Sequence, residues 1–266
     1  MRLFWSMVGV EVRKRMSYRV DFWINSVVGF VTELGVAWFI VLAMFSGSDR
    51  VGGFSRDGML LYYVAIILIA RLVRSTDLEW AIADDIYQGA LSRYLLYPVT
   101  YGVLKYATQI GALLPALVQV ALFGAWVPFV LGIPEGVHLT PATVAMSAGA
   151  IVVANALHFL STYPIQLVAF WADNCWSLLV AHRLIAMLFG GILLPLALFP
   201  AWSQPILNAL PYRYMFAFPA DALLGRLSVA EYAWGLGIAV AWCGIFAAVS
   251  AAVWRRGTLQ YTGVGM

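Results

Sequence analysis

Six long apolar stretches, separated by short polar segments, limit how this chain can fold. They cover approximately Phe22–Phe45, Met59–Val73, Tyr106–Leu131, Thr143–Trp171, Leu178–Phe199 and Tyr232–Trp254. A helix needs about 20 predominantly apolar residues to cross the hydrocarbon core of a bilayer. The second stretch is shorter, but Arg71 and Arg74 at its end can extend their long side chains to the membrane interface. We therefore predict an all-α, polytopic membrane protein with six transmembrane helices, forming one domain over residues 1–266.

The charge content supports this interpretation. Only 11% of the 266 residues are charged, and the mean hydropathy is +0.86, whereas soluble globular domains carry about 25% charged residues. With both termini inside, 12 of the 16 Lys and Arg residues lie in cytoplasmic segments, and the four outer ones are Arg50, Arg56, Arg213 and Arg226. This bias follows the positive-inside rule, so we expect both termini in the cytoplasm. It gives no reason to expect nucleic-acid binding.

The first 20 residues mix aromatic and aliphatic side chains with five basic ones. They are too charged to cross a bilayer and fit a helix lying in the cytoplasmic interface. A basic flank that only fixes topology is an equally good interpretation. No small-residue cleavage site follows the first span, so we expect the segment to be retained rather than removed as a signal peptide.

The sequence contains no recognisable motif for catalysis or metal binding. His138, His158 and His182 form no HExxH motif, there is no GxSxG elbow, and Cys175 and Cys243 have no metal-ligand spacing. The two cysteines are expected to be small buried apolar residues. We therefore expect no catalytic residue, no metal site and no enzyme activity in this chain.

One sizeable loop, residues 75–105, faces the cytoplasm in this topology. The spacing predicts a helix from Asp77 to Leu91, with an apolar stripe of Leu78, Ile82, Ile86 and Ala90 and with Glu79, Asp84 and Asp85 on its other faces. Gly89 and Pro98 mark its end. Such a helix suits a groove on a soluble partner, and a solvated or lipid-lying connector is the alternative.

A second unusual region runs from Gly190 to Gly225. It contains five prolines, which are Pro195, Pro200, Pro205, Pro211 and Pro219. Because proline interrupts helices, this region cannot form one continuous helix. We predict a fifth span that ends near Phe199, followed by short re-entrant helices that dip back from the outer side between spans five and six.

Together these features resemble the permease subunits of type-2 ABC exporters, specifically the small six-span group that works with a separate ATPase. The resemblance is carried by the N-terminal segment, the six spans, "IYQGALSRYLLYPV", "LPLALFP…LPYRYMFAFPADALLG" and the ending "WRRGTLQYTGVG". It implies an export pathway in the bacterial cytoplasmic (inner) membrane. The implied substrate is an amphiphile, such as a lipid, a glycolipid, a peptide or a drug-like product.

In that family the inward helix between the second and third spans is a coupling helix docked on the ATPase. The resemblance implies that residues 77–96 form this region, with Asp84–Leu96 as the coupling segment. The implied coupling residues are Asp84, Asp85, Ile86, Tyr87, Gly89, Leu91 and Arg93. We expect an exposed stripe that includes Ile86, Tyr87 and Leu91 to fill a groove on the ATPase. Asp84, Asp85 and Arg93 are expected to set the register at its rim.

The resemblance also implies that the outer segment Leu194–Pro219 caps the pathway between two permeases. The implied gate candidates are Leu194, Pro195, Pro200, Leu210, Pro211, Tyr212 and Phe216. Because re-entrant apolar backbone must be covered by protein, we expect Leu210, Tyr212 and Phe216 to approach the partner permease.

The expected partners follow from what the chain lacks. Its two lysines, Lys14 and Lys105, stand outside any GxxxxGK[ST] motif, so the chain cannot hold ATP on a P-loop. The resemblance implies that ATP and Mg are bound by a separate ABC ATPase, in two copies. It also implies a second permease copy, the same or related, and contact with membrane lipid. Symmetry favours a homodimer.

Polar residues inside predicted spans are candidates for the pathway. Glu33 lies within the first span with Asn25 nearby, and it is the strongest candidate. His158 lies in the fourth span, where a packing contact between helices is the favoured interpretation. Asp173 and Asn174 mark the inner end of that span.

Two other functions stay open at this point. An ion-coupled secondary transporter would use the intramembrane charges, although the two halves show no inverted repeat. A membrane enzyme or assembly factor acting on lipid would need a metal or an equivalent site. Asp84 and Asp85 could in principle bind a metal, but adjacent residues on a helix diverge by about 100°.

Overall fold

The computed structural model describes residues 2–17, 19–74, 79–132, 134 and 137–262. Within these residues the protein is helical and has no β-strand, and one isolated β-bridge joins Val51 and Phe54. The predicted all-α class is confirmed.

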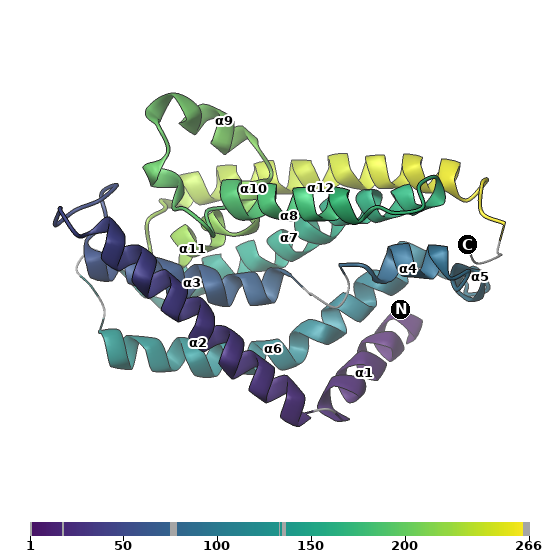
Figure 1. Ribbon diagram of the computed structural model, residues 1–266, viewed down its shortest axis with the longest axis horizontal. Helices are drawn as coiled ribbons and strands as arrows, with labels where there is room; N and C mark the ends of the chain where they lie inside the picture. The colour runs from purple at the N-terminus through teal and green to yellow at the C-terminus, as the bar shows by residue number, and fades with distance from the viewer. Residues whose placement is uncertain (1, 18, 75–78, 133, 135–136, 263–266) are drawn as a thin grey trace.

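The helices are traced in Figure 1. Their bounds are α1 (Arg2–Ser17), α2 (Arg19–Met44), α3 (Arg56–Val73), α4 (Ala81–Tyr87), α5 (Leu91–Tyr94), α6 (Tyr101–Leu131), α7 (Pro141–Gln166), η2 (Leu167–Phe170), α8 (Trp176–Phe189), η3 (Leu196–Leu198), η4 (Ala201–Ser203), α9 (Gln204–Ala209), α10 (Tyr212–Met215), α11 (Ala217–Leu223) and α12 (Val229–Gly257).

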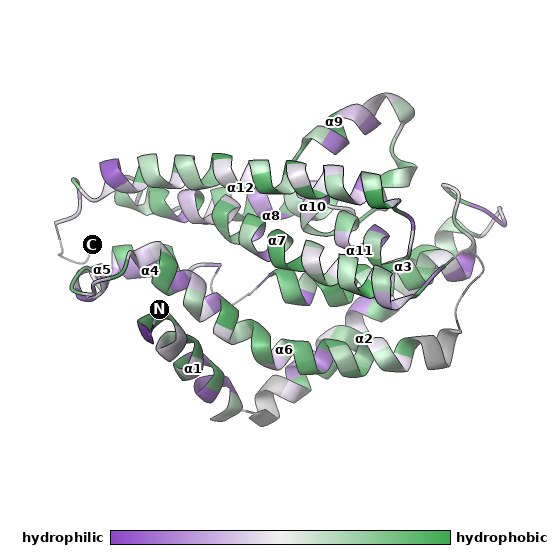
Figure 2. Ribbon diagram, turned by 180° about the vertical axis from the view of Figure 1, so that it is seen from behind, coloured by the Kyte–Doolittle hydropathy of each residue, from purple (hydrophilic) through white to green (hydrophobic). Residues whose placement is uncertain are grey.

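Four of the described helices are long and apolar enough to cross a membrane, namely α2, α6, α7 with η2, and α12. Figure 2 shows that they are hydrophobic along most of their length. They correspond to the first, third, fourth and sixth apolar stretches, and they confirm a multi-pass membrane protein. The second stretch lies in α3, which has 18 residues and carries Arg56, Asp57 and Arg71.

The predicted fifth span, Leu178–Phe199, is wrong in its extent. Helix α8 ends at Phe189 and has 14 residues. The chain turns at Gly190 and Gly191, and Gly191 has φ 86°, a conformation that glycine adopts at low cost. A Cβ added at Gly191 would lie 2.6 Å from the Tyr62 hydroxyl, so the turn is pressed against α3. Beyond it the chain forms the short helices η3, η4, α9, α10 and α11, as the five prolines predict.

Helix α3 forms the centre of the fold. Of its 18 residues 15 are buried, and it contacts α2, α6, α7 and α11. Phe30 of α2 stacks on Phe123 of α6 with ring centroids 4.4 Å apart, which closes the layer over one side of α3. Because α3 is covered by protein on nearly all sides, Arg71 lies among other helices rather than against lipid, whereas Arg56 and Asp57 are exposed in the first turn of α3.

Local capping explains where several helices begin. Ser55 caps α3 by accepting a hydrogen bond from the Gly58 amide at 3.2 Å. Helix α12 begins with a capping box in which Ser228 and Glu231 bond each other's backbone amides. Thr140 and Thr143 form the equivalent box at the start of α7.

Helix α1 packs along α6. A Cβ added at Gly111 of α6 would lie 2.7 Å from the Val8 carbonyl oxygen, so the two backbones approach closely there. The helix expected over the first 20 residues is therefore present, and its position in the membrane interface stays a prediction. In Figure 1 the start of α1, helices α4 and α5 and the end of α12 lie at one end of the molecule, and α9 lies at the other.

Candidate functional site

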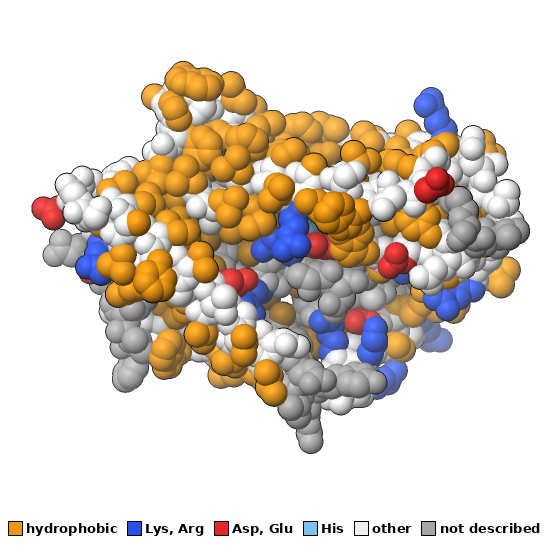
Figure 3. All heavy atoms as spheres, in the orientation of Figure 1, with side chains coloured by type: hydrophobic (Ala, Val, Ile, Leu, Met, Phe, Trp, Pro, Cys, Tyr) orange, Lys and Arg blue, Asp and Glu red, His pale blue; other side chains and the backbone are white. Residues whose placement is uncertain are grey.

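A groove of about 740 Å³ lies between α1, α2, α3, α6 and the turn after α8. Figure 3 shows Lys, Arg, Asp and Glu side chains gathered in the hollow of this face, with hydrophobic side chains around them. The polar lining residues are Glu11, Lys14, Arg15, Asn25, Ser26, Thr32, Glu33, Arg71, Arg74 and Gln119. The larger apolar ones are Val36, Ile40, Tyr63, Ile67, Leu113, Met187, Ile192 and Leu193. The groove is therefore amphipathic.

Glu33 lies in this groove and is paired with Arg71. The Arg71 Nη2 donates to Glu33 Oε2 at 3.0 Å, and Nη1 donates to the Ser26 carbonyl at 3.3 Å. Ser26 Oγ in turn donates to Gln119 Oε1 at 2.6 Å. These contacts join α2, α3 and α6 through polar groups. The predicted pathway candidate Glu33 thus belongs to a network that ties three helices at the groove wall, and Asn25 lines the same groove.

Arg74, at the end of α3, lies where the groove meets a small cavity of about 30 Å³. That cavity is also lined by His158, His182 and Phe216, and it has room for about one water molecule. The Arg74 guanidinium lies over the Phe216 ring, 5.7 Å from its centroid. Burial lowers the pKa of Arg74, and Glu79 acts in the opposite direction. An arginine keeps its charge in proteins, so Arg74 is a partly buried cation.

His158 does not reach the groove. It is buried, and its ring contacts the edge of Phe216 with centroids 6.3 Å apart. This contact between α7 and the segment joining α10 and α11 agrees with the packing role favoured from the sequence. Asp173 and Asn174 are exposed in the turn between η2 and α8.

At the end of the molecule that carries α4 and α5, which we call the α4–α5 end, α4 is fixed to the body of the protein. The Ile82 amide donates to Gln166 Oε1 at 3.1 Å. Asp85 Oδ2 lies 2.6 Å from Lys105 Nζ and accepts a hydrogen bond from the Tyr101 hydroxyl at 2.8 Å. The side chains of Lys105 and Asp85 are only 9% and 12% exposed. A short helix in the cytoplasmic loop is thus joined to the start of α6 and to the end of α7.

The structure corrects the predicted extent of the helix in this loop. The predicted helix Asp77–Leu91 is not continuous, because α4 ends at Tyr87 and Gly89 has φ 69° before α5 begins. Asp77 and Leu78 lie outside the described residues.

The expected exposed stripe is also wrong. Ile86 is 3% exposed and Leu91 is 0% exposed. Together with Ile82 they pack into a cluster with η2 and the end of α7. The periodicity identified an apolar face correctly, but this face is covered by the chain itself. Asp85 is likewise buried against Lys105 rather than placed at a rim.

Tyr87 is half-buried beside Cys175. Burial raises the pKa of Tyr87, with Cys175 adding to the effect. Asp84 and Arg93 are exposed, as expected.

The exposed apolar residues of this loop follow the predicted helix. Leu95, Leu96 and Tyr97 are 50%, 86% and 43% exposed. We call residues 95–97 the LLY segment. The coupling segment Asp84–Leu96 expected from the resemblance includes Leu95 and Leu96, but neither was named among the coupling residues. Three large apolar residues directly before Pro98 in a cytoplasmic loop are an unusual pattern for a solvated connector.

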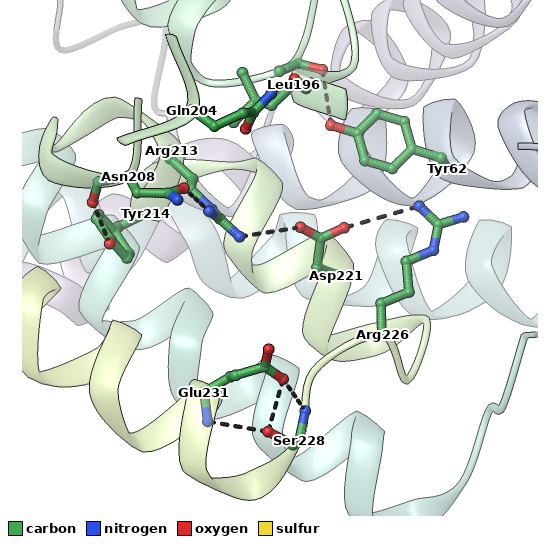
Figure 4. A network of polar contacts seen from close by, with 11 residues as sticks. Tyr62, Leu196, Gln204, Asn208, Arg213, Tyr214, Asp221, Arg226, Ser228 and Glu231 are labelled. Atoms are coloured by element: carbon green, nitrogen blue, oxygen red, sulfur yellow. Dashed lines mark hydrogen bonds and ion pairs between the residues drawn. The ribbon is translucent and has the colours of Figure 1, made fainter. Parts of the chain in front are cut away.

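The other end of the molecule carries a polar cavity of about 530 Å³. Figure 4 shows Asp221 of α11 between Arg213 and Arg226, at 4.0 and 3.9 Å. The Arg226 guanidinium lies 4.1 Å from the centroid of the Phe54 ring. Burial raises the pKa of Asp221 to about 6, against the opposing effect of the two arginines. Tyr62 donates to the Gly191 carbonyl at 3.0 Å, so the turn after α8 is fixed to α3 beside this cavity.

The gate candidates lie in different environments. Pro195, Pro211 and Phe216 are buried, Leu194, Leu210 and Tyr212 are half-buried, and Pro200 is exposed. The expectation that Phe216 approaches a partner permease is wrong. Its side chain is 0% exposed and is covered by residues of its own chain, including Arg74 and His158.

The most exposed large apolar residues in this region are Trp202 and Ile206, at 74% and 55%. Both belong to the part of the chain, η4 and α9, that projects from the helical body in Figure 1.

Comparison with known families decides the identity. The model of a family described as ABC-2 family transporter protein matches residues 31–265, which include the groove-lining parts of α3 and α6, the LLY segment and the helices from α8 to α12. The chain belongs to this family. A search of curated proteins and a search of solved structures each found no match.

Membership confirms the resemblance to a type-2 ABC permease subunit, and it implies an ABC ATPase partner in general terms. Together with the four long apolar helices it identifies a multi-pass membrane protein. An ABC-2 permease needs a passage for substrate and a surface for its ATPase. The groove and the LLY segment are the candidates for these two sites.

Proposed function

We propose that this protein is the permease subunit of an ATP-driven exporter, that it lies in the bacterial cytoplasmic membrane with both termini inside, and that it forms half of the pathway for an amphiphilic substrate. The observation that carries this proposal is the amphipathic groove of about 740 Å³ between α1, α2, α3 and α6. Family membership gives the class of machine, and the groove gives the place where a molecule can be held. A second copy of the chain would supply the other half.

Six spans remain the best topology for this function. With a rise of 1.5 Å per residue, the 18 residues of α3 extend about 27 Å, close to the hydrocarbon thickness. Its protein neighbours shield Arg71 from lipid, and the exposed Arg56 and Asp57 lie in its first turn, where they would reach the membrane interface. The 14 residues of α8 extend about 21 Å, and the turn and short helices after Phe189 would complete the crossing inside protein. In this arrangement α9–α11 would lie at the outer mouth and act as a gate.

The chain itself would carry no nucleotide site and perform no catalysis. ATP and Mg would be bound by two copies of an ABC ATPase, docked at the α4–α5 end. There the LLY segment offers exposed apolar side chains beside the charged residues Asp84 and Arg93. Exposed apolar anchors with a polar rim are the usual composition of a protein interface.

The contacts of α4 suggest how the force would be transmitted. Asp85 is bound to Lys105 of α6, and the Ile82 amide is bound to Gln166 of α7. Movement of the ATPase subunits would displace the LLY segment and pull on the starts and ends of two long helices. Since α6 also lines the groove, closure of the ATPase pair would change the shape of the pathway.

The test compares two exposed leucines at the α4–α5 end. Leu96 is 86% exposed in the LLY segment, and Leu259, beyond the end of α12, is 87% exposed. Tagged wild-type, Leu96→Asp and Leu259→Asp proteins are purified from host membranes, and the ATPase retained on each is measured with its hydrolysis rate. Loss of a central interface anchor costs about 2 kcal/mol or more, which is roughly thirtyfold in affinity.

We expect Leu96→Asp to lose the ATPase and Leu259→Asp to retain it. Equal retention by all three proteins would show that the LLY segment is not the docking site. Absence of any ATPase on the wild-type protein would contradict the proposed function itself.

The ion pair between Glu33 and Arg71 in the groove favours one second candidate, an ion-coupled secondary transporter. In such a protein an intramembrane carboxylate binds and releases the coupling ion. The two functions differ in their energy source, because an exporter of this family requires ATP and a secondary transporter requires an ion gradient.

A further inference from the structure

The charges in the groove are not balanced. Four basic side chains, Lys14, Arg15, Arg71 and Arg74, line it together with two acidic ones, Glu11 and Glu33. Arg15 pairs with Glu11 at 3.2 Å, and Arg71 pairs with Glu33 at 3.0 Å. Lys14 and Arg74 remain, so the lining carries two positive charges in excess of its acids.

Arg74 is the more informative of the two. Within the described part of the chain it has no hydrogen-bond or ion-pair partner, and its Nε atom is buried without an acceptor. Its guanidinium instead lies against the Phe216 ring. A buried charge is normally paired, because leaving it without a counter-charge is costly. An anion held in the groove beside Arg74 would supply that counter-charge.

Two further donors at the groove wall also lack acceptors. Arg71 Nε and Gln119 Nε2 are both buried without a hydrogen-bond partner among the described residues. Both residues line the groove, together with Arg74. The guanidinium groups of Arg71 and Arg74, which line the groove, are rich in N–H donors and favour a ligand group with acceptor oxygens, such as a phosphate, a sulfate or a carboxylate.

The polar and apolar linings are separated along the groove. On α2 the polar residues Asn25 to Glu33 come first, and Val36 and Ile40 follow. On α3, which runs in the opposite direction, Tyr63 and Ile67 precede Arg71 and Arg74. From Arg71 to Tyr63 the wall extends about 12 Å along the helix axis. The groove therefore has a cationic end near α1 and an apolar end near Ile192 and Leu193.

We propose that the substrate is an anionic amphiphile, with its headgroup held beside Arg74 and Arg71 and its apolar chain lying along α2 and α3 toward Ile192. This assignment rests on the proposed function, because it takes the groove as the pathway. It narrows the substrate class, since cationic amphiphiles would be repelled by the excess positive charge. It also makes Arg74 a substrate-binding residue at the cytoplasmic end, where a molecule would be loaded.

The test uses three probes that share a dodecyl chain and differ in headgroup charge. Dodecyl phosphate, dodecylphosphocholine and dodecyltrimethylammonium are added separately to the full-length protein in a non-ionic detergent, and occupancy is measured by native mass spectrometry. We expect dodecyl phosphate to bind about tenfold more tightly than dodecyltrimethylammonium, because contacts to a charged group are among the stronger hydrogen bonds. Equal binding of the three probes would overturn the proposal.

Variants separate charge from structure. Arg74→Gln should lose the preference for dodecyl phosphate, and Arg74→Lys should keep most of it. Arg256→Gln, at an exposed arginine near the end of α12 and outside the groove, is the matched control and should bind as the wild type does. If Arg74→Gln keeps the full preference while its helix content and melting temperature match the wild type, Arg74 does not hold the headgroup.

Whether the carboxylate of Asp77 already neutralises Arg74 can also be tested. Asp77 follows Arg74 by three residues in the sequence and lies outside the described residues. Asp77→Asn should leave dodecyl phosphate binding unchanged. Tighter binding in this variant would mean that Asp77 already neutralises Arg74, and this result would overturn the assignment.

A last measurement distinguishes a substrate from a lipid that is permanently bound. In a complex of this protein with its ATPase, dodecyl phosphate should stimulate ATP hydrolysis in the wild type and not in Arg74→Gln. Binding without stimulation would identify a structural lipid site and would refute the substrate assignment. Selective binding by a chain that retains no ATPase would leave the anionic site in place and refute the proposed function instead.

Discussion

The buried ion pair between Asp85 and Lys105 offers the sharpest test of how the cytoplasmic loop is held. Asp85→Ala removes the carboxylate that accepts from Lys105 Nζ at 2.6 Å and from the Tyr101 hydroxyl at 2.8 Å. Lys105 is then left 9% exposed without its counter-charge. The neighbouring Asp84 is exposed, so Asp84→Ala is a matched control one residue away.

Breaking a buried pair by removing one partner costs about 3–5 kcal/mol. Because the lysine lies at the end of the molecule, where it can shift toward water, we expect a value near the lower limit, about 3 kcal/mol. For a chain of this size, 1 kcal/mol changes the melting temperature by about 2–4 °C. Asp85→Ala should therefore lower it by roughly 6–12 °C. Asp84→Ala should change stability by about 0.5 kcal/mol or less.

The assay combines thermal unfolding of the purified protein with amide hydrogen exchange over residues 79–97. Asp85→Ala should speed exchange in α4 and α5, whereas Asp84→Ala should not. The double variant Asp85→Ala with Lys105→Met removes both charges and should recover most of the lost stability. If Asp85→Ala and Asp84→Ala behave alike, the pair does not fix α4 to α6 and the proposed route of force transmission is wrong.

Two further predictions concern the other end of the molecule. Gly235→Ala should destabilise by about 1–3 kcal/mol, because the added Cβ would clash with the buried Phe218 ring, while Gly237→Ala in the same helix meets nothing within 4 Å and should be neutral or slightly stabilising in thermal unfolding. Since burial raises the pKa of Asp221 to about 6, the folded state takes up a proton that the unfolded state releases, so this group should make stability fall as pH rises from about 4 to about 6. Asp221→Asn should remove that slope in melting curves taken across this range, and an unchanged slope would show that Asp221 does not cause it.

The sequence predicted the long helices well, because about 20 apolar residues in a row leave few alternatives. It overextended the fifth span, since the residues from Ile192 to Phe199 are as apolar as those of a spanning helix, and only the turn at Gly190 and Gly191 ends α8 at Phe189. That turn depends on a tertiary contact with Tyr62, which is 129 residues away from Gly191 in the sequence and is invisible to local periodicity.

The site was predicted unevenly for the same reason. Glu33 was identified because a carboxylate inside an apolar span marks a candidate for the pathway, but its pairing with Arg71 follows only from the packing of α2 against α3. The stripe containing Ile86 showed that one face of the loop helix is apolar. Whether such a face is covered by the same chain or by a partner depends on η2 and the end of α7. The expected coupling segment Asp84–Leu96 therefore included Leu95 and Leu96 but named the covered Ile86 and Leu91 as its contact residues.

The measurement that tests the central claim most directly is transport by the reconstituted complex. The protein and its ATPase are placed in liposomes, and movement of a fluorescent anionic amphiphile between leaflets is followed with ATP alone, with a proton or sodium gradient alone, and with neither. We predict movement with ATP alone and none with either gradient alone. Movement driven by an ion gradient in the absence of ATP would contradict the account and identify a secondary transporter.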